Sequence, residues 1–514
     1  MPASFYGVDN DIKAIDESKK LFRQFINIGS ANFVCTDGLF PYESKSKNVG
    51  WKRLRKELNE DCGFDIIVSN PPWGSDLSKY DSEAINTNFR LAKGQYDVYD
   101  LFVELVLDNL RPNGVFGLIL PDSIFNTEQR FLREFLSKET TLLMICRLGE
   151  KIFPDVNRGC TVIIGRKAEP HENHKVSCFR LNVSDKKKIL SQQIGLYEMH
   201  NQTSHMVPQD RFKEDSSYNF SIDLKSEDEP ILTILNKCLR LSDVVTISRG
   251  VELSKKGDIC QCSVCHKWFP VPKKSTFQCI HCKSSLKLVD LIKDKIITKE
   301  IFGKSEPLLT GEDIFRFTSK NKYWIKFGKE GINYKDLSLY KQKKICVRKT
   351  GIGVTACLDY NGSVTTQVVY IITINDKFKD LLSLEFVISV LNSRLITYYL
   401  IKTYGESEWR THPYITQTQL KNIPFPDVDV IFSNKIKIVD KVNDLVSKEV
   451  ANSIDRNISK KVDLFLERSV AYCFGLTKNE YEKVFLTLNN SEKLIPIKRL
   501  LNTNEEEIFS IDGF

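Results

Sequence analysis

The residues best suited to chemistry stand in one short string, Asn70-Pro71-Pro72-Trp73, directly after the apolar run 64–68. That run reads as a buried strand, and ligands bind in open α/β sheets just beyond the carboxyl ends of the strands. The Asn70 amide can accept one hydrogen bond and donate others. Pro72 restricts Pro71 to an extended conformation, which fixes the direction of the Pro71 carbonyl. With the flat face of Trp73, these groups could hold a planar amino group by two acceptors while stacking its ring. A strand that ends in a proline-rich turn is the alternative.

Four cysteines form a second set of residues whose type and spacing could do chemistry. Two Cys-x2-Cys pairs, Cys262 with Cys265 and Cys279 with Cys282, are separated by 13 residues. This spacing suits a structural zinc ion held by four thiolates, which would leave no open position for catalysis. Cys260, His266 or His281 could replace one ligand. A redox role is disfavoured because no βαβ unit surrounds the pairs. All 14 cysteines are expected to be reduced.

Basic residues gather around these cysteines and again near residue 345. The candidates for phosphate contacts are Lys255, Lys256, Lys273, Lys274, Lys344, Arg348 and Lys349. Such clusters neutralise phosphates and give salt-sensitive binding, although each could instead be a solvated face. The net charge of 74 − 66 = +8 is compatible with a polyanionic partner.

The elements that must position these residues can be read from the apolar pattern. Strand-like runs at 6–8, 33–35, 65–68, 115–120 and 161–164 alternate with helix-like stretches such as 12–25 and 99–110. This alternation predicts a parallel α/β sheet with helices on both faces. Residues 168–230 read as a strand or two and a connecting segment. Further along, strand-like runs at 344–349, 354–358 and 364–373 precede helix-like stretches at 384–400 and 433–475.

The composition sets limits on the class of protein. The chain has 514 residues, 41% of them hydrophobic and 27% charged, which is the balance of an ordinary globular protein of about three domains. No apolar run approaches the length of a membrane helix, which is about 18–20 residues. The first residues lack the pattern of a secretory signal. We therefore expect a cytoplasmic protein that does not bind a membrane.

The Asn70 string resembles the fourth motif of amino-methyltransferases, above all of the N6-adenine DNA methyltransferases. Residues 5–9 look like their second motif, which places Asp9 on the ribose hydroxyls of S-adenosylmethionine. Residues 35–38 look like the third motif, with Asp37 near the cofactor adenine. Residues 99–102 look like the fifth, whose Leu101 and Phe102 line the adenine pocket, and residues 153–154 look like the eighth, whose aromatic Phe153 packs on the target base. Trp73 would stack that base, with Phe153 as the weaker candidate. Singly, each has another explanation: an aspartate after a strand is often a helix cap, and Phe102 or Phe153 could be core.

One motif of the N6-adenine DNA methyltransferases has no counterpart in this sequence. The family's first motif, a Phe-x-Gly-x-Gly loop after the first strand, should precede the second motif, which here begins at residue 5. We therefore expect that this chain lacks the first strand and the glycine loop of the family, and that an upstream polypeptide supplies them. Alone, the chain is expected to bind S-adenosylmethionine poorly.

The second half resembles the target-recognition domain of type IIG methyltransferases, in strings such as 248–252, 307–314, 347–351, 391–393 and 420–424. The resemblance implies three domains. Residues 1–205 form a Rossmann-like methyltransferase core that is incomplete at the N-terminus. Residues 206–430 form a mixed α/β target-recognition domain with a zinc ribbon at 258–285, and residues 431–514 form a helical subdomain.

The implied activity is methylation of the N6 amine of a flipped adenine in double-stranded DNA, within a restriction-modification or phage-defence system. S-adenosylmethionine is the implied cofactor and zinc a structural ion. One alternative is a non-catalytic DNA-binding remnant, and a weaker one is a protein-glutamine methyltransferase, which also uses an Asn-Pro-Pro motif. Any associated nuclease would lie upstream.

Overall fold

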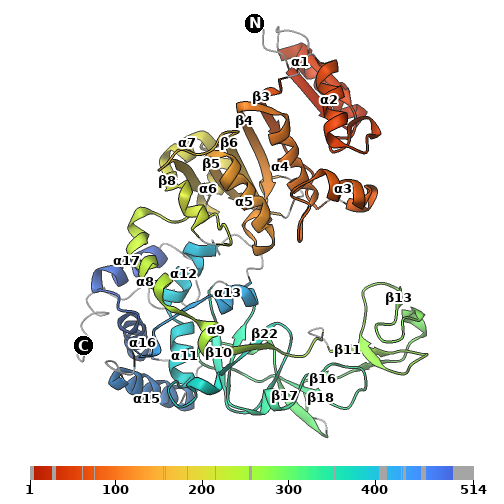
Figure 1. Ribbon diagram of the computed structural model, residues 1–514. Coiled ribbons are helices and arrows are strands. Elements are labelled where there is room, and N and C mark those ends of the chain that lie inside the picture. The colour runs from red at the N-terminus through yellow and green to blue at the C-terminus, as the bar shows by residue number, and fades with distance from the viewer. Residues whose placement is uncertain are drawn as a thin grey trace. The chain divides into compact units, whose positions relative to one another are not determined.

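The computed structural model forms two compact units, Met1–Ser226 and Glu227–Phe514, each described here by itself (Figure 1). The residues it describes are 5–25, 31–58, 60, 62–74, 76–153, 156, 158–181, 183–214, 216–253, 257–301, 303–351, 353–404, 414–429, 431, 436–452 and 459–489. The division falls after Ser226 instead of near residue 205, because β8 (His205–Pro208) pairs with β7 (Lys175–Arg180) in the first unit.

The first unit begins with a small βαβ element. Strands β1 (Phe5–Asp9) and β2 (Ala31–Cys35) pair in parallel, and α1 (Ile12–Phe25) connects them. The ring of Phe22 on this helix lies 5.3 Å from that of Phe5 and 5.2 Å from that of Phe33. Aromatic packing of the helix against both strands thus supports a two-stranded sheet, which would be marginal alone.

A separate six-stranded sheet carries the rest of the first unit. Its order is β3-β4-β6-β5-β7-β8, where the strands not yet given are β3 (Phe64–Ser69), β4 (Leu110–Pro121), β5 (Thr141–Gly149) and β6 (Cys160–Arg166). The prediction of a parallel sheet holds for β3 with β4 and for β5 with β7. It is wrong for β6, which is antiparallel to β4 and β5. Only residues 150–159 join β5 to β6, too few for a helical crossover.

Helices α4 (Val98–Asn109), α5 (Arg130–Glu139) and α7 (Leu196–Thr203) pack against strands of this sheet. The other helices of the unit after α1 are α2 (Lys47–Glu57), α3 (Ser82–Asn88) and α6 (Val183–Leu190). The main core packs Tyr99 and Val103 of α4, and Leu136 of α5, against Phe116 and Ile163 of the sheet.

The outer edge of β3 is open. Strand β3 pairs with β4 on one side, and no described residue pairs with its other side. Two apolar side chains of the strand, Ile66 and Val68, are 67% and 77% exposed. An apolar strand with one free edge and exposed aliphatic side chains is unusual in a folded domain.

The second unit is built on two four-stranded sheets, with a ribbon inserted in the sequence between β10 (Val245–Arg249) of one sheet and β16 (Ile297–Thr298) of the other. The first sheet orders β10, β22 (Val369–Ile374), β19 (Lys344–Arg348) and β20 (Ala356–Asp359), and the second orders β16, β18 (Tyr323–Lys326), β17 (Ser305–Leu309) and β21 (Val364–Thr365). The ribbon holds β11 (Asp258–Gln261), β12 (Trp268–Pro270), β13 (Thr276–Gln278), β14 (Ser285–Lys287) and β15 (Lys293–Lys295). A last pair joins β9 (Leu239–Arg240) to β23 (Pro424–Phe425).

Helices complete the second unit. They are α8 (Glu229–Lys237), α9 (Leu241–Val244), α10 (Ser338–Lys341), α11 (Leu384–Leu391), α12 (Arg394–Tyr404), α13 (Gln417–Lys421), α15 (Ile436–Asn452), α16 (Lys460–Cys473) and α17 (Lys478–Asn489). Arg316 pairs with Asp463 and with Glu467 of α16, so buried ion pairs attach the C-terminal helices to the sheets. Among the described residues, no single helix could cross a membrane, and only the bent pair α11 and α12 would reach that length together.

Candidate active site and candidate metal centre

The polar residues predicted for the site follow β1, β2 and β3, each of which is parallel to its neighbour in its own sheet. Asp9 is the last residue of β1, Asp37 comes two residues after β2, and Asn70 comes directly after β3. The carboxyl ends of parallel strands share one edge of their sheet, where a ligand site is expected. The structure therefore places Asp9 and Asp37 at the edge of one sheet and Asn70 at the edge of the other.

The two aspartates differ in how their carboxylates are held. Asp9 is exposed, and its Oδ1 accepts the backbone N–H of Asp11 at 2.8 Å. Asp37 Oδ1 accepts the N–H groups of Leu39 and Phe40, and its Oδ2 accepts the Tyr80 hydroxyl at 2.8 Å. Burial and the hydrogen bond to Asp37 raise the pKa of Tyr80 well above its ordinary value of 10. Asp37 is thus a fixed carboxylate, with room for one more donor among its roughly four acceptor positions.

The aromatic wall beside Asp37 comes from α4. The Phe102 ring fills the space next to Gly38, where an added Cβ would lie 2.8 Å from Phe102 Cε1. Leu101 is completely buried, in a core cluster with Leu39 and Phe40. Of the two predicted cofactor-pocket residues, Phe102 therefore faces the Asp37 turn, whereas Leu101 supports the wall from inside.

The Asn70–Gly74 loop presents its amide to solvent. Pro71 is buried and Pro72 is exposed, while Asn70 is exposed and its side chain has no hydrogen-bond partner among the described residues. Trp73 is half-buried and its Nε1 donates to the Ile119 carbonyl of β4 at 3.3 Å. The loop thus combines a fixed indole with an amide that is free to bind.

The structure brings Trp73 and Phe153, the two proposed stacking residues, together. Their ring centroids are 6.3 Å apart in an edge-to-face arrangement, and both rings pack against the core cluster around Leu148 and Phe179. The neighbouring Pro154 lies outside the described residues. Two aromatic side chains from distant segments thus meet at the loop that carries the free amide.

Sequence reasoning missed Asp97, the residue that caps α4. Its Oδ1 accepts the Val98 N–H at 2.6 Å and the Gly74 N–H at 3.0 Å, and Asp100 Oδ2 accepts the Asp97 N–H at 2.8 Å. Burial raises the pKa of Asp100 to about 7. The pattern Asp-x-x-Asp before an apolar helix is a capping-box signal that could have identified this residue.

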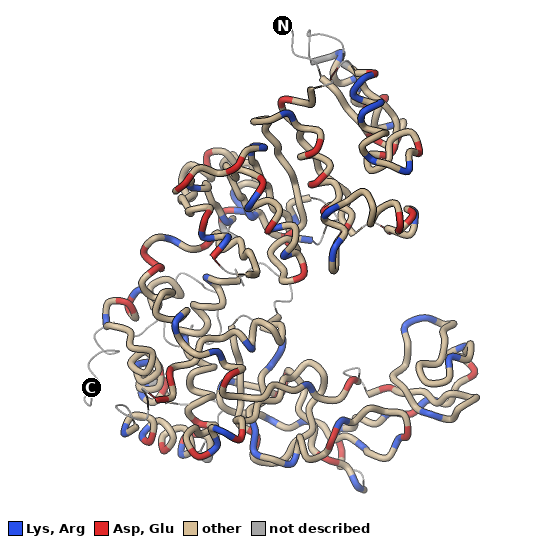
Figure 2. The backbone as a smooth tube through the Cα atoms, viewed as in Figure 1, with Lys and Arg blue, Asp and Glu red and all other residues tan. Residues whose placement is uncertain are grey.

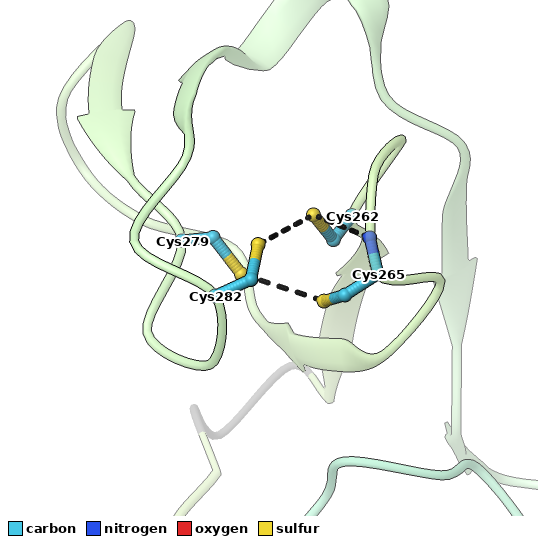
Figure 3. Close-up of side chains that lie close together, drawn as sticks. All are labelled: Cys262, Cys265, Cys279 and Cys282. Carbon is cyan, nitrogen blue, oxygen red and sulfur yellow. Dashed lines mark hydrogen bonds between the residues drawn. The ribbon is translucent and has the colours of Figure 1, made fainter.

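The four predicted cysteines meet at one point of the ribbon (Figure 3). All four Sγ atoms lie within 4.8 Å of one another. The distances are 3.7 Å from Cys262 Sγ to Cys282 Sγ and 3.9 Å from Cys265 Sγ to Cys279 Sγ. A tetrahedral zinc ion with Zn–S distances of about 2.3 Å separates its thiolates by about 3.8 Å. The four cysteines therefore fit zinc.

The two cysteine pairs make the same turn. After each pair stands a residue with positive φ, His266 at 58° and Lys283 at 63°. The N–H groups of these residues donate to the carbonyls of Cys262 and Cys279. The hydrogen bond between Cys282 and Ser284 lowers the pKa of the Cys282 thiol to about 6. This twofold repetition is what a thiolate-held metal ion requires of its loops.

The alternative ligands lie elsewhere. His281 Nε2 makes its hydrogen bond with the Trp268 carbonyl at 3.2 Å. Cys260 is fully buried in the apolar core of the ribbon with Phe269 and Leu286. Neither belongs to the group of four sulfur atoms.

Six of the seven predicted phosphate contacts lie in three pairs along the chain. Lys273 and Lys274 are exposed on the ribbon, whose residues 258–295 hold seven lysines and three aspartates (Figure 2). Arg348 and Lys349 are partly exposed, and Lys349 Nζ lies 5.6 Å from the Tyr414 ring centroid. Lys255 and Lys256 lie outside the described residues.

The prediction for Lys344 needs correction. Its side chain is 0% exposed, and its Nζ pairs with Asp359 Oδ2 at 2.5 Å and donates to the Tyr340 carbonyl. Lys344 sits in a strand whose side chains are buried on both faces, and its ammonium satisfies a buried carboxylate. It therefore stabilises the fold and cannot contact a phosphate.

Comparison with known families matches two segments of the chain. Residues 4–153 match the family described as Eco57I restriction-modification methylase, and residues 306–425 match the TaqI-like C-terminal specificity domain. The first segment contains the Asn70–Gly74 loop, and the second runs from β17 to β23.

Individual relatives have low sequence identity to this chain, and the matches cover only part of each relative. The Type I restriction enzyme EcoEI methylase subunit of Escherichia coli is 25% identical over 175 residues, which are 32% of this chain and 34% of the relative. The Type II methyltransferase M.VspI of Vibrio sp. (strain 343) is 23% identical over 184 residues, 36% of this chain and 41% of the relative. The chain thus covers less than half the length of each. The solved structure of the Type IIL restriction-modification enzyme MmeI in complex with DNA gives a TM-score of 0.47 at 9% identity, over 97% of this chain and 63% of that one.

Proposed function

On the premise that this chain is a restriction-modification methylase, as its two matched segments show, we propose that it methylates the N6 amine of adenine in double-stranded DNA. S-adenosylmethionine is the proposed methyl donor. The observation that carries the proposal is the free Asn70 amide beside the Trp73–Phe153 aromatic pair, at the carboxyl end of β3. Recognition of an exocyclic amine needs such an acceptor next to an apolar stacking surface.

The cofactor would be held on the β1–β2 side of the site. The Asp9 carboxylate is the proposed acceptor for two ribose hydroxyls, as in dinucleotide sites. Asp37 would accept the amino group of the cofactor adenine, and Phe102 would form one wall of its pocket. When bound, the cofactor supplies an activated methyl group.

The target base would be held on the β3 side. An adenine inside a duplex must be flipped out to be methylated, at a cost of a few kcal/mol. Trp73 would stack the extruded ring, with Phe153 as a second contact. The Asn70 side-chain oxygen and the Pro71 carbonyl would accept the two N–H bonds, which leaves the electron pair of the amine directed at the methyl group. These acceptors stabilise the positive charge that develops on nitrogen.

The second unit would bind the DNA. Residues 306–425 match a specificity domain, and the ribbon carries exposed lysines such as Lys273 and Lys274. We propose that Cys262, Cys265, Cys279 and Cys282 hold a structural zinc ion that shapes this ribbon. A plot of the logarithm of the DNA-binding constant against the logarithm of the salt concentration becomes steeper by about 0.9 for each phosphate that a lysine neutralises. Replacing both lysines with alanine should therefore lower the magnitude of this slope by about 2.

We also propose that an upstream polypeptide contributes a strand between β1 and β3. Both strands have a partner on one side only within the described residues, and both run parallel to that partner. The exposed Ile66 and Val68 would be covered by such a strand, and a glycine loop following it would reach the cofactor side of the site. Titration calorimetry tests this: the isolated chain should bind S-adenosylmethionine weakly, and tight binding by it would contradict the proposal.

The proposed activity is tested by label transfer. The full chain, with and without the upstream polypeptide, is incubated with tritiated S-adenosylmethionine and unmethylated DNA, and the DNA is digested to nucleosides. We expect label in N6-methyl-2′-deoxyadenosine. Label in N4-methyl-2′-deoxycytidine would refute the adenine assignment. DNA binding without any transfer, even with the added polypeptide, would favour the non-catalytic remnant.

A further inference from the structure

We infer that Asp97 is a positioning residue for the proposed reaction, because its carboxylate fixes the Asn70–Gly74 loop to the start of α4. The effect of Asp97 on catalysis rests on the proposed function. The attachment of the loop to α4 is seen directly in three hydrogen bonds. One oxygen, Asp97 Oδ1, accepts the N–H of Val98 at the first turn of α4 and the N–H of Gly74 at the end of the loop. The Asp97 backbone is held in turn by Asp100 Oδ2.

The Gly74 turn depends on this contact. Gly74 has φ +67°, a conformation that costs a residue with a side chain about 1–2 kcal/mol. A Cβ added there would also lie 2.5 Å from Arg158 Nη1. The exposed turn thus lies against the Arg158 guanidinium on one side, while the Asp97 carboxylate accepts its N–H. Without that acceptor, the amide of Gly74 loses its partner and the turn loses a tether.

The loop is tethered to two different elements. Trp73 Nε1 donates to Ile119 on β4, and Gly74 donates to Asp97 at the start of α4. Asn70 has no comparable side-chain contact among the described residues. The direction of its amide is therefore set by the backbone of the loop, and that backbone is set by these two tethers.

The helix that Asp97 caps also carries the cofactor side of the site. Phe102 of α4 packs against Gly38, next to the Asp37 turn. One carboxylate thus links the loop that would grip the target amine to the helix that would line the cofactor pocket. Methyl transfer needs donor and acceptor in line, and a misplacement of about 1 Å can cost about 10²-fold in rate.

The contact requires an oxygen acceptor and not a charge. An asparagine at position 97 offers the same acceptor to the Gly74 N–H, whereas alanine offers none. We therefore expect Asp97→Asn to behave nearly as the wild type and Asp97→Ala to be impaired. Asp81 is a matched control, because it caps α3 by accepting the Glu83 N–H and has no contact with the loop among its recorded hydrogen bonds.

Two measurements on the full chain test the inference. In the label-transfer assay, with the upstream polypeptide present, Asp97→Ala should lower kcat by about 10²-fold and leave the KM for DNA within about threefold, while Asp97→Asn and Asp81→Ala stay within about threefold of wild type in both. In hydrogen exchange by mass spectrometry, the amides of Asn70, Trp73 and Gly74 should exchange at least about tenfold faster in Asp97→Ala alone, since the two prolines between them carry no amide hydrogen.

Two results would overturn the inference: wild-type rates in Asp97→Ala, or an Asp97→Asn variant as impaired as Asp97→Ala. Should Asp97→Ala fail to fold, Asp97→Ser restores a capping oxygen to α4 but is too short to reach Gly74 as well, and it should show the same loss of rate and protection. If the wild type itself transfers no methyl group, the proposed function fails, and the exchange measurement still decides whether Asp97 holds the loop.

Discussion

Replacing Asn70 with alanine should separate activity from stability. Asn70 is exposed, and no described residue hydrogen-bonds its side chain. The loop around it is held by other groups, namely the buried Pro71, the Trp73 indole on Ile119 and the Gly74 amide on Asp97. Exposed substitutions away from caps, cores and networks change the free energy of unfolding by less than about 0.5 kcal/mol. We therefore expect Asn70→Ala to unfold at nearly the same denaturant concentration as the wild type.

The loss of activity should be large. In the proposed reaction, the Asn70 oxygen is one of two acceptors that hold the amine and stabilise its developing charge. Removing one such aligned hydrogen-bonding group from an active site costs about 10²–10³-fold in kcat, or about 2.7–4 kcal/mol. Because the amide contributes little to DNA contacts outside the pocket, the affinity for DNA should stay within about threefold.

The assay is single-turnover transfer of tritiated methyl groups to unmethylated DNA, with the upstream polypeptide present and DNA affinity measured at the same salt concentration. Asn48→Ala is a matched control, since Asn48 is an exposed asparagine on α2. The reasoning is refuted if Asn70→Ala transfers methyl groups within about threefold of the control. It is equally refuted if the loss of transfer is matched by an equal loss of DNA affinity or of stability.

Three further predictions follow from buried groups. Cys279→Ser should reduce bound zinc, measured by mass spectrometry, from about one equivalent to less than half, and it should expose residues 258–295 to protease while the first unit stays resistant. Lys344→Met leaves the Asp359 carboxylate buried without its partner, so urea unfolding should show a loss of about 3–5 kcal/mol with no change in the salt slope of DNA binding. Burial raises the pKa of Asp100 from 3.8 to about 7, so the folded chain keeps a proton that the unfolded chain releases between these values. The stabilisation of the folded state by this retained proton is complete below about pH 4 and is lost as the pH rises through 7. Asp100→Asn cannot ionise, so the free energy of unfolding of this variant should fall less than that of the wild type between pH 5 and pH 8.

Most of the fold could be predicted because its strands are continuous apolar runs. The predicted strands at 6–8, 33–35, 65–68, 115–120 and 161–164 correspond to β1, β2, β3, β4 and β6. The strands β5 and β7 were not predicted individually, and the direction of β6 was predicted wrongly. Strand direction depends on the length and path of a connection, which composition and periodicity do not record. The resemblance to restriction-modification methylases agrees with the two matched segments, residues 4–153 and 306–425.

The site was predictable where residue type alone carries the chemistry. The four cysteines meet as their spacing requires, and Trp73 and Phe153 meet although 80 residues separate them. Lys344 shows the limit, because a lysine within a basic run cannot be recognised as buried until Asp359 is seen opposite it in the sheet. Asp97 shows a second limit, since its contact with Gly74 joins two segments that no local pattern connects.

The two halves of the proposed site belong to different sheets, and this has a consequence for its assembly. Asp9 and Asp37 follow strands of the β1–β2 pair, whereas Asn70 and Trp73 follow a strand of the six-stranded sheet. No backbone ladder joins the sheets among the described residues. Side chains link them instead: Leu39 and Phe40, which follow β2, share a buried cluster with Leu101 of α4, and Tyr80 donates to Asp37. The distance between the cofactor half and the base half is therefore set by side-chain packing, without a strand pairing between the two sheets in the described part of the chain. A strand that joined β1 to β3 would fix that distance, so strand docking and cofactor binding should be thermodynamically linked, each strengthening the other by the same factor.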